Sequence, residues 1–177
     1  MSGDSSGTPG ESTSAGVLAY QLDLLKVEIG IIQMIVDRID CTTQGTKNWA
    51  VVTWVAAVGL SLQQEQIRPF IAATAVLPIL FWYIDGVWRH LQRRSTYRML
   101  KIGEFLNGDN LVLSFQLGRL QGFTVMDPVA RQYRRTQDYE KHVSLWRTLR
   151  FREVAVFYAV PALISIFLGV ANGFLAA

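Results

Sequence analysis

Three apolar runs, separated by charged stretches, dominate the pattern of this chain. They occupy residues 49–62, 69–84 and 154–177. None of the runs contains a charged residue, and polar positions do not alternate with apolar ones inside them. This is typical of helices that face lipid, because lipid offers no partner for a charge or an open backbone group. The pattern predicts an all-α membrane protein with three transmembrane helices, a hairpin within residues 47–88 and a C-terminal span over residues 153–177.

The three runs differ in their ability to cross a bilayer. The third has 24 residues, or about 36 Å of helix at 1.5 Å per residue, which exceeds the roughly 30 Å of a hydrocarbon core. Residues 50–62 of the first run give only about 20 Å, so this run spans only if Lys47, Asn48 and residues 63–66 reach the two interfaces. A buried hairpin in a soluble all-helical protein is the alternative.

The residues before the hairpin divide into a tail and a long helix. Residues 1–15 are mostly Ser, Gly, Thr, Pro and Glu, which bury too little apolar surface to offset their ordering entropy, so we expect a disordered tail. Residues 16–46 are predicted to form a cytoplasmic amphipathic helix, whose apolar positions follow the 3-4 spacing of a heptad repeat. This first stripe comprises Leu22, Leu25, Ile29, Ile32, Val36 and Ile39.

A second apolar stripe lies roughly 130° around the same helix. It comprises Leu24, Val27, Ile31 and Met34. Two apolar faces indicate two packing partners, the cytosolic helices of the same chain and a neighbouring subunit, whereas one broad face packed within a single chain is the alternative. The polar residues 42–47 are interpreted as a joint between this helix and the first span.

Positive charge is concentrated between the second and third runs. Residues 86–152 carry 13 Lys and Arg against 5 Asp and Glu, although the whole chain has a net charge of only +3. Because the cytoplasmic flanks of spans are enriched in Lys and Arg, this basic cytoplasmic region, residues 89–152, indicates an N-terminus inside and a C-terminus outside. Asp85 ends the second span and is expected at the interface or facing a wet interior, since a carboxylate in mid-membrane is costly.

Local signals divide the basic region. No proline follows the second span until Pro128, so its helix is expected to continue to Leu106, where residues 107–110 provide an Asn-Gly-Asp-Asn stop signal. Residues 111–125 are predicted to form either a small β-hairpin or a short helix with a loop. Asp127 and Pro128 then open a last helix as N-cap and first helical residue, and this helix is expected to run on into the third span.

The common catalytic motifs do not occur in the sequence. There is no phosphate-binding Gly-Lys-Ser/Thr loop, no His-Glu-x-x-His and no Gly-x-Ser-x-Gly. Cys41 is the single cysteine, and His90 and His142 are the two histidines. We therefore expect no enzyme, no metal site and no cofactor.

The basic region nevertheless offers a candidate site for an anion. Arg131, Arg134 and Arg135 lie about 20 residues before the third span, roughly 30 Å along a helix. Positive-inside bias and lipid head groups explain them less well than the arginines beside the spans. Arginine–phosphate pairing and tyrosine stacking suit a nucleotide or a single-stranded oligodeoxynucleotide. The candidate ligand-binding residues are Arg93, Arg94, Arg98, Arg131, Tyr133, Arg134 and Arg135.

Small and polar residues on the spans form a second candidate set. Gly169 and Gly173 make a Gly-x-x-x-Gly motif, and small residues let helices approach closely in lipid. The set is interpreted as pore lining or a subunit interface, and packing of the three spans within one chain is the alternative. Its members are Thr53, Ala57, Ser61, Asp85, Gly169, Asn172 and Gly173.

The layout resembles a family of bacterial membrane effectors. An amphipathic helix leads into Lys47-Asn48-Trp49-Ala50-Val51-Val52-Thr53, a tight hairpin follows, and a basic helix containing Tyr97 ends at Phe105-Leu106. This is similar to the small SLATT-like effectors of anti-phage defence operons. The third span and the basic module are similar to the channel effector of the Hailong system.

The resemblance implies a tetrameric ion channel in the bacterial inner membrane, multi-pass, with a periplasmic C-terminus. Its opening would depolarise the infected cell, and in the Hailong case an oligodeoxyadenylate holds the channel closed. We therefore expect a homo-oligomeric channel effector, gated by a nucleotide or oligonucleotide on the basic region, with the bilayer and its own copies as partners. The alternative is a non-conducting membrane scaffold that docks a partner protein through the heptad helix.

Overall fold

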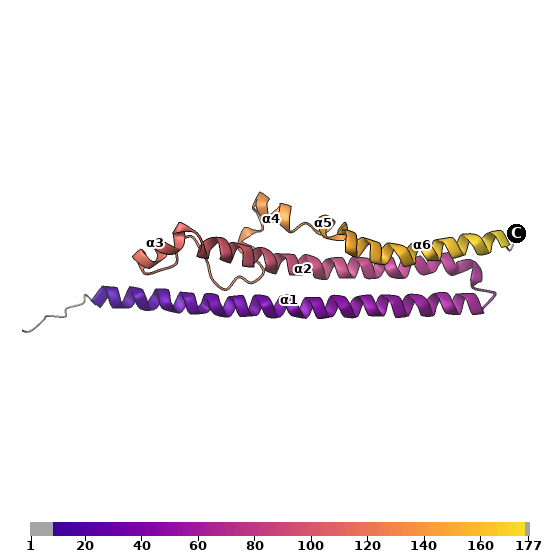
Figure 1. Cartoon of the computed structure of the whole chain (residues 1–177), viewed down its shortest axis with the longest axis horizontal. Coiled ribbons are helices and arrows are strands. Elements are labelled where there is room, and N and C mark those ends of the chain that lie inside the picture. Colours follow the sequence, from indigo (N-terminus) through magenta and orange to yellow (C-terminus); the bar gives the residue numbers. More distant parts are fainter. Residues whose placement is uncertain (1–8, 176–177) are drawn as a thin grey trace, which may run out of the picture. The chain divides into compact units, whose positions relative to one another are not determined.

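The computed structural model describes the backbone of residues 9–175 and the side chains of residues 15–172. Within the described backbone every regular element is helical, in agreement with the all-α prediction (Figure 1). Residues 1–8 of the predicted disordered tail lie outside the described part. Residues 9–15 of that tail are helical, because the first helix already begins at Pro9.

Helix α1, Pro9–Gln63, is continuous through the residues that the sequence suggested as a joint. The threonines there hydrogen-bond within the helix: Thr42 donates to the carbonyl of Arg38 (2.8 Å), Thr43 to that of Asp40 (3.0 Å) and Thr46 to that of Thr42 (2.9 Å). Such bonds let polar side chains remain inside a helix. The predicted joint at residues 42–47 is therefore wrong, and the amphipathic helix and the first apolar run belong to one element.

The second apolar run begins in a 3-10 helix, η1 (Arg68–Ala75), and continues as helix α2, Val76–Leu106. Helix α2 ends where the stop signal predicted. The side chain of Asn107 donates to the carbonyl of Gly103 (2.8 Å), and Gly108 is the N-cap of helix α3, Asp109–Leu117. Of the two alternatives for residues 111–125, the short helix with a loop is confirmed.

The predicted continuous last helix is wrong. After the loop the chain forms η2 (Arg131–Tyr133), α4 (Gln137–His142) and α5 (Leu145–Leu149), and only then α6 (Arg152–Leu175). The short helices are held by tertiary contacts of buried residues, among them Tyr139 of α4 and Thr148 of α5. Packing thus overrides the helical preference of a segment that contains neither Gly nor Pro between residues 129 and 151.

The chain divides into two compact units, each containing part of α1 and part of α2. The first unit comprises residues up to 36 together with 93–142, and the second comprises residues 37–92 and 143–177. The core of the first is formed by Leu25, Ile32 and Ile102, so the first stripe is the face of α1 that packs within this unit. In the second unit Ala50, Val154 and Tyr158 form the core.

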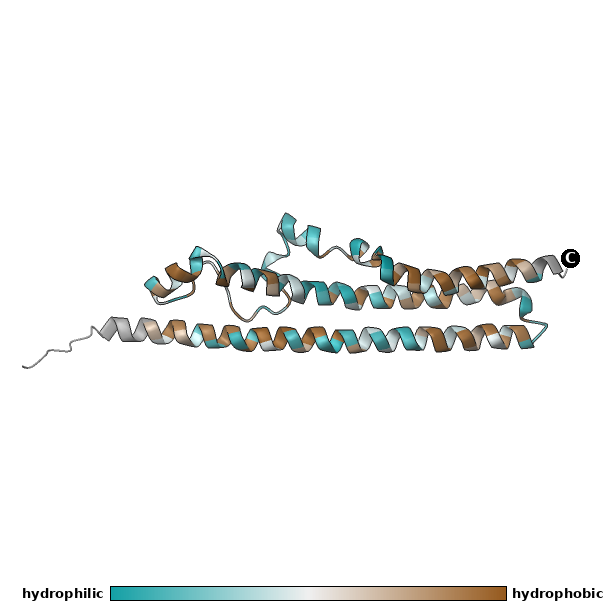
Figure 2. Cartoon of the chain, in the orientation of Figure 1, coloured by the Kyte–Doolittle hydropathy of each residue, from teal (hydrophilic) through white to brown (hydrophobic). Residues whose placement is uncertain are grey.

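Two helical segments are long and apolar enough to cross a membrane. They lie within Arg68–Leu106 and Gln137–Asn172, and Figure 2 shows hydrophobic residues along most of α6. The shorter run in α1, residues 49–62, is not one of these two segments. The all-helical fold and two helices able to span a membrane are thus common to the prediction and the structure.

Candidate functional site

A buried ion pair fixes the loop that precedes the predicted anion site. The side chains of Glu28 (α1) and Arg98 (α2) are both 0% exposed, with Arg98 Nε 2.7 Å from Glu28 Oε1 and Nη2 3.1 Å from Oε2. The guanidinium also lies over the ring of Phe123, 4.3 Å from its centre, and donates to the carbonyl of Thr124. Buried charges persist only when they are paired and hydrogen-bonded, and this pair meets both conditions.

The carboxylate of Glu28 also binds the backbone of the loop that follows Thr124. It accepts hydrogen bonds from the backbone amides of Met126 (2.7 Å) and Asp127 (3.0 Å), so the loop is tied directly to α1. Met126 and Ala130 adopt left-handed backbone conformations, with φ of 65° and 52°, which are strained for residues with a side chain. We call Glu28, Arg98 and the loop residues 124–127 the clamp.

The clamp leads into a compact basic turn, residues 131–135. The Asp127 carboxylate accepts from the amides of Arg131 (2.9 Å) and Gln132 (3.0 Å), and this fixes the start of η2. Asp127 was expected to cap a long helix, and it instead closes this single turn. The side chains of Arg131, Arg134 and Arg135 are exposed, and none of the three forms an ion pair within the described part of the chain.

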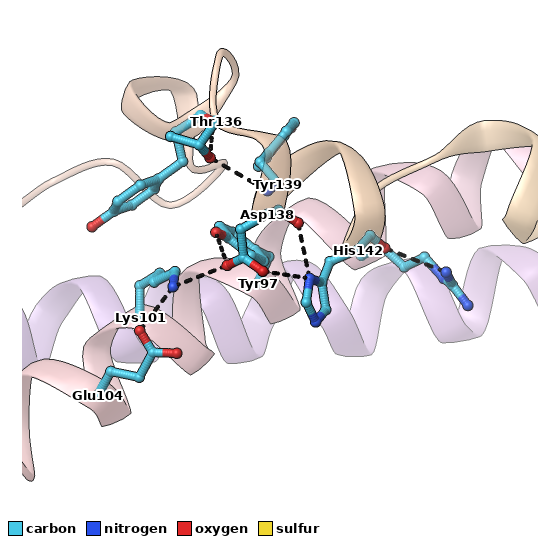
Figure 3. Close-up of polar contacts among 9 residues, drawn as sticks. Tyr97, Lys101, Glu104, Thr136, Asp138, Tyr139 and His142 are labelled. Carbon is cyan, nitrogen blue, oxygen red and sulfur yellow. Dashed lines mark hydrogen bonds and ion pairs between the residues drawn. The ribbon is translucent and has the colours of Figure 1, made fainter.

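An aromatic and charged cluster attaches α4 to α2 (Figure 3). The buried Tyr97 hydroxyl donates to Asp138 Oδ2 (2.8 Å), and Lys101 Nζ lies 3.2 Å from the same oxygen and 2.8 Å from Glu104. His142 Nδ1 lies 3.3 Å from the other Asp138 oxygen. Asp138 is therefore shared by three side chains from α2 and α4.

Three rings surround that of Tyr97. The rings of Tyr133, Tyr139 and His142 lie with their centres 5.8, 5.3 and 5.6 Å from it, and both tyrosines are edge-on. Edge-to-face aromatic pairs contribute about 0.5–1.5 kcal/mol beyond their buried area. Tyr133 belongs to the basic turn, so the cluster holds the turn as well as α4 against α2.

The cluster, which lies outside the apolar runs, shifts the pKa values of its members. The hydrogen bond from Tyr97, followed by that from Lys101, lowers the pKa of Asp138 below its ordinary value. Burial, followed by the hydrogen bond to Asp138, raises the pKa of Tyr97. The hydrogen bond to Glu104 is the largest of the contacts that raise the pKa of Lys101. A carboxylate, a protonated phenol and an ammonium are thus mutually stabilised near neutral pH.

The structure groups the predicted ligand-binding residues unequally. Arg131, Tyr133, Arg134 and Arg135 share the basic turn, while Arg93 and Arg94 are half-buried on α2. Nη1 of Arg93 donates to the carbonyl of His142 (3.4 Å). Arg98 is not on the surface with the others, since it is buried in the clamp.

Glu28 was missed by sequence reasoning, although a signal was present. Its position lies between Leu25 and Ile32, on the buried face of the first stripe. A charge on such a face requires a buried partner of opposite charge, and Arg98 is that partner.

The residues predicted to line a pore or an interface lie in the second unit, and several of them pack within the chain. Ser165 of α6 accepts from Trp54 Nε1 of α1 (2.8 Å) and from the Thr74 hydroxyl of η1 (2.9 Å). A Cβ added at Gly169 would lie 2.6 Å from Cβ of Ala72 in η1. Gly169 therefore packs against another segment of the same chain, which was the alternative to a pore or subunit interface. Gly173 lies outside the residues whose side chains are described.

The remaining members of this set satisfy their polar groups locally or lie buried. Ser61 is buried and donates to the carbonyl of Ala57 (2.8 Å), and Asn172 donates to that of Leu168 (2.8 Å). Thr53 and Ala57 are half-buried. Asp85, expected at an interface or facing a wet interior, is fully buried within its unit, with Oδ1 3.6 Å from Nε of Arg89.

No protein-family model, curated protein or solved structure matches this chain. Among the described residues, no group of three or more His, Cys, Asp or Glu is arranged to hold a metal ion. The two arrangements that carry a functional argument are therefore the clamped basic turn of the first unit and the three-segment helical packing of the second.

Proposed function

We propose that this protein is a homo-oligomeric ion channel effector of bacterial antiviral defence. It depolarises the membrane when opened and is gated by a nucleotide or oligonucleotide bound to its basic turn. The observation that carries the proposal is the partly exposed second stripe of α1, where Val27 and Met34 are exposed and Leu24 and Ile31 are half-buried. The same helix continues into an apolar run. The resemblance to SLATT-like and Hailong-type effectors supports the choice of a channel.

Membrane insertion is supported by the low burial of the apolar segments. Only 28% and 17% of the most apolar stretches of the two candidate segments are buried, whereas the core helix of a soluble protein is mostly covered. The proposal adds the first run, residues 49–62 of α1, as a further span, and Val52, Val55 and Leu60 are exposed there. The proposed orientation in the bacterial inner membrane has the N-terminus in the cytoplasm and the C-terminus in the periplasm.

Self-association is supported by the second stripe. Val27 and Met34 are 53% and 69% exposed, in contrast to the packed first stripe. Val17 and Tyr20 are exposed too and extend the same 3-4 spacing toward the N-terminus. Apolar positions over about two and a half heptads, four of them exposed and two half-buried, favour packing against an equivalent helix of another subunit, and we propose a tetramer.

Ligand gating is supported by the connections of the basic turn. Three guanidinium groups lie beside Tyr133 and form no ion pair with the residues that the structure describes. They suit a phosphate-rich ligand with stacking bases. The clamp ties this turn to α1, and the Tyr97 cluster ties it to α2. Helices α1 and α2 both continue into the second unit, which contains the apolar segments. A ligand that changes the conformation of the basic turn would therefore act on the two helices that carry these segments.

Conductance tests the channel directly. Purified protein in a planar bilayer is expected to carry current that a short single-stranded oligodeoxyadenylate reduces, and overexpression in bacteria is expected to collapse a potential-sensitive dye signal. Normal membrane potential with the protein verified in the membrane fraction contradicts the channel proposal.

The ligand is tested by binding of the same oligonucleotide. Changing Arg131, Arg134 and Arg135 together to alanine is expected to weaken binding and to reduce the salt slope by about 2, at about 0.7 per phosphate contact on a single strand. The matched control changes Lys26, Arg38 and Arg119, which are exposed, to alanine, with the same loss of charge. Equal loss in both variants contradicts a specific site in the basic turn.

The second stripe also favours a second candidate function, a non-conducting scaffold that docks a different protein. Val27→Glu with Met34→Glu is expected to lower the oligomeric mass in detergent, and Gln33→Glu, on an exposed position of the same helix, is the control. A monomeric wild-type protein would contradict the homo-oligomer and favour the scaffold.

A further inference from the structure

The residues around the start of α6 form an elbow with two different faces. We define the elbow as residues 144–153, which include α5 and the first two residues of α6. Its inner face is fixed to α2: Trp82 Nε1 donates to the carbonyl of Leu149 (3.1 Å), and a Cβ added at Gly86 would lie 2.3 Å from Leu149 Cδ2. Thr148 is buried and donates to the carbonyl of Ser144 (3.0 Å). The elbow is therefore held in place by its contacts with α2 and by its own hydrogen bonds.

The outer face of the elbow is an open depression of about 800 Å³. It is lined by three arginines, Arg147, Arg150 and Arg152, and by the aromatic rings of Trp146 and Phe151. Trp146 is 77% exposed. On the surface of a soluble protein this is unusual, because tryptophan side chains are highly buried on average. Cations and an exposed indole side by side are typical of the membrane–water boundary.

Charge and position both favour an anion at this place. The depression contains one acid, Glu153, against its three arginines, so its net charge is positive. Arg150 and Arg152 form no ion pair within the described residues. Helix α6 also begins here, and the dipole of a helix favours negative charge at its N-terminus. The uninterrupted apolar run begins immediately afterwards, at Val154.

We infer that the elbow binds the phosphate of an anionic phospholipid in the cytoplasmic leaflet. The arginines pair with the phosphate oxygens, which guanidinium groups match in geometry. Trp146 and Phe151 contact the glycerol and upper acyl region, which a free phosphate does not possess. The inference rests on the membrane placement of α6 in the proposed function, and it holds equally for a channel and for a scaffold.

The probe is phosphatidylglycerol, titrated into the detergent-solubilised full chain and counted as retained lipid by native mass spectrometry. Phosphatidylcholine with the same acyl chains tests the head group, and inorganic phosphate tests whether the anion alone suffices. The variant is Arg147→Gln with Arg150→Gln and Arg152→Gln, and the matched control is Lys26→Gln with Arg38→Gln and Arg119→Gln, three exposed cations outside both proposed sites. A second elbow variant has lysine at positions 147, 150 and 152. It keeps the positive charge of the three arginines and removes only their planar guanidinium groups.

Phosphatidylglycerol is expected to bind the wild-type chain at least about tenfold more tightly than phosphatidylcholine, and the elbow variant is expected to lose this preference while the control keeps it. The lysine version is expected to recover part of it. Equal binding of both lipids, equal loss in both glutamine variants, or complete displacement by inorganic phosphate overturns the inference.

Membrane placement is measured separately by extraction of cell membranes with alkaline carbonate. Release of the protein by carbonate contradicts the proposed membrane function. Retention of the protein without a lipid preference contradicts the elbow site alone.

Discussion

Replacing Arg98 with alanine removes one half of the buried clamp and leaves the Glu28 carboxylate without its opposite charge. Both side chains are 0% exposed, so water does not compensate for the loss. Breaking a buried ion pair from one side costs about 3–5 kcal/mol, a large part of the roughly 5–15 kcal/mol that stabilises a typical domain. Arg134→Ala removes an exposed arginine and is expected to change stability by no more than about 0.5 kcal/mol.

Removing both charges distinguishes the clamp from an ordinary buried pair. Exchange of a whole pair for apolar residues is often neutral or stabilising. Here Glu28→Met with Arg98→Leu also leaves the amides of Met126 and Asp127 without their acceptor, and each unsatisfied donor costs about 1–3 kcal/mol. The double variant is therefore expected to remain less stable than the wild type.

Thermal unfolding in mild detergent gives the order of stability, and hydrogen exchange locates the change. The amides of Met126 and Asp127 are expected to be protected in the wild type and in Arg134→Ala, and to exchange faster in both clamp variants. A stabilising role of the clamp is refuted if Arg98→Ala unfolds at the same temperature as Arg134→Ala and the amides of Met126 and Asp127 exchange as in the wild type.

Three further predictions concern the helical packing and the charged cluster. Gly169→Leu forces a side chain against Ala72 and is expected to destabilise the second unit by about 1–3 kcal/mol in thermal unfolding, with Val170→Leu as an exposed control; equal midpoints would contradict the close approach. Ser165→Ala leaves the indole donor of Trp54 unsatisfied, with an expected cost of about 1–3 kcal/mol, and Trp54→Phe in the same background should restore part of it; additive losses would contradict the hydrogen bond. The lowered pKa of Asp138 stabilises the fold above the ordinary pKa of about 3.9, so the difference in melting temperature between wild type and Asp138→Asn is expected to vanish as pH falls through the lowered value. A difference that does not change with pH would contradict this linkage.

The sequence was most informative where local chemistry decides the structure. The first stripe follows from heptad spacing alone, and the end of α2 follows from the stop signal after Leu106. It was least informative where distant contacts decide. Ser144, the N-cap of α5, is only a weak local sign that α4 and α5 separate. The two helices pack on distant residues of α2, α4 on Tyr97 and α5 beside Gly86.

The candidate site divides in the same way. The arginines of the basic turn could be chosen by their distance from the spans, and the structure gathers them in one turn. Arg98 is chemically identical to them in the sequence, and only the three-dimensional pairing with Glu28 separates a structural arginine from exposed ones. The position of Glu28 inside the apolar first stripe was the available signal. It indicates that a buried cation must pair with Glu28, and it does not identify which one.

The hydrogen bond from Trp54 to Ser165 has a consequence for biosynthesis. The acceptor follows the donor by 111 residues, so during translation the first apolar segment is made long before the residue that satisfies its indole. In the proposed membrane, a donor exposed to lipid in this way is costly. The last helix therefore completes the first, and a chain truncated before α6 would leave the Trp54 indole without its acceptor.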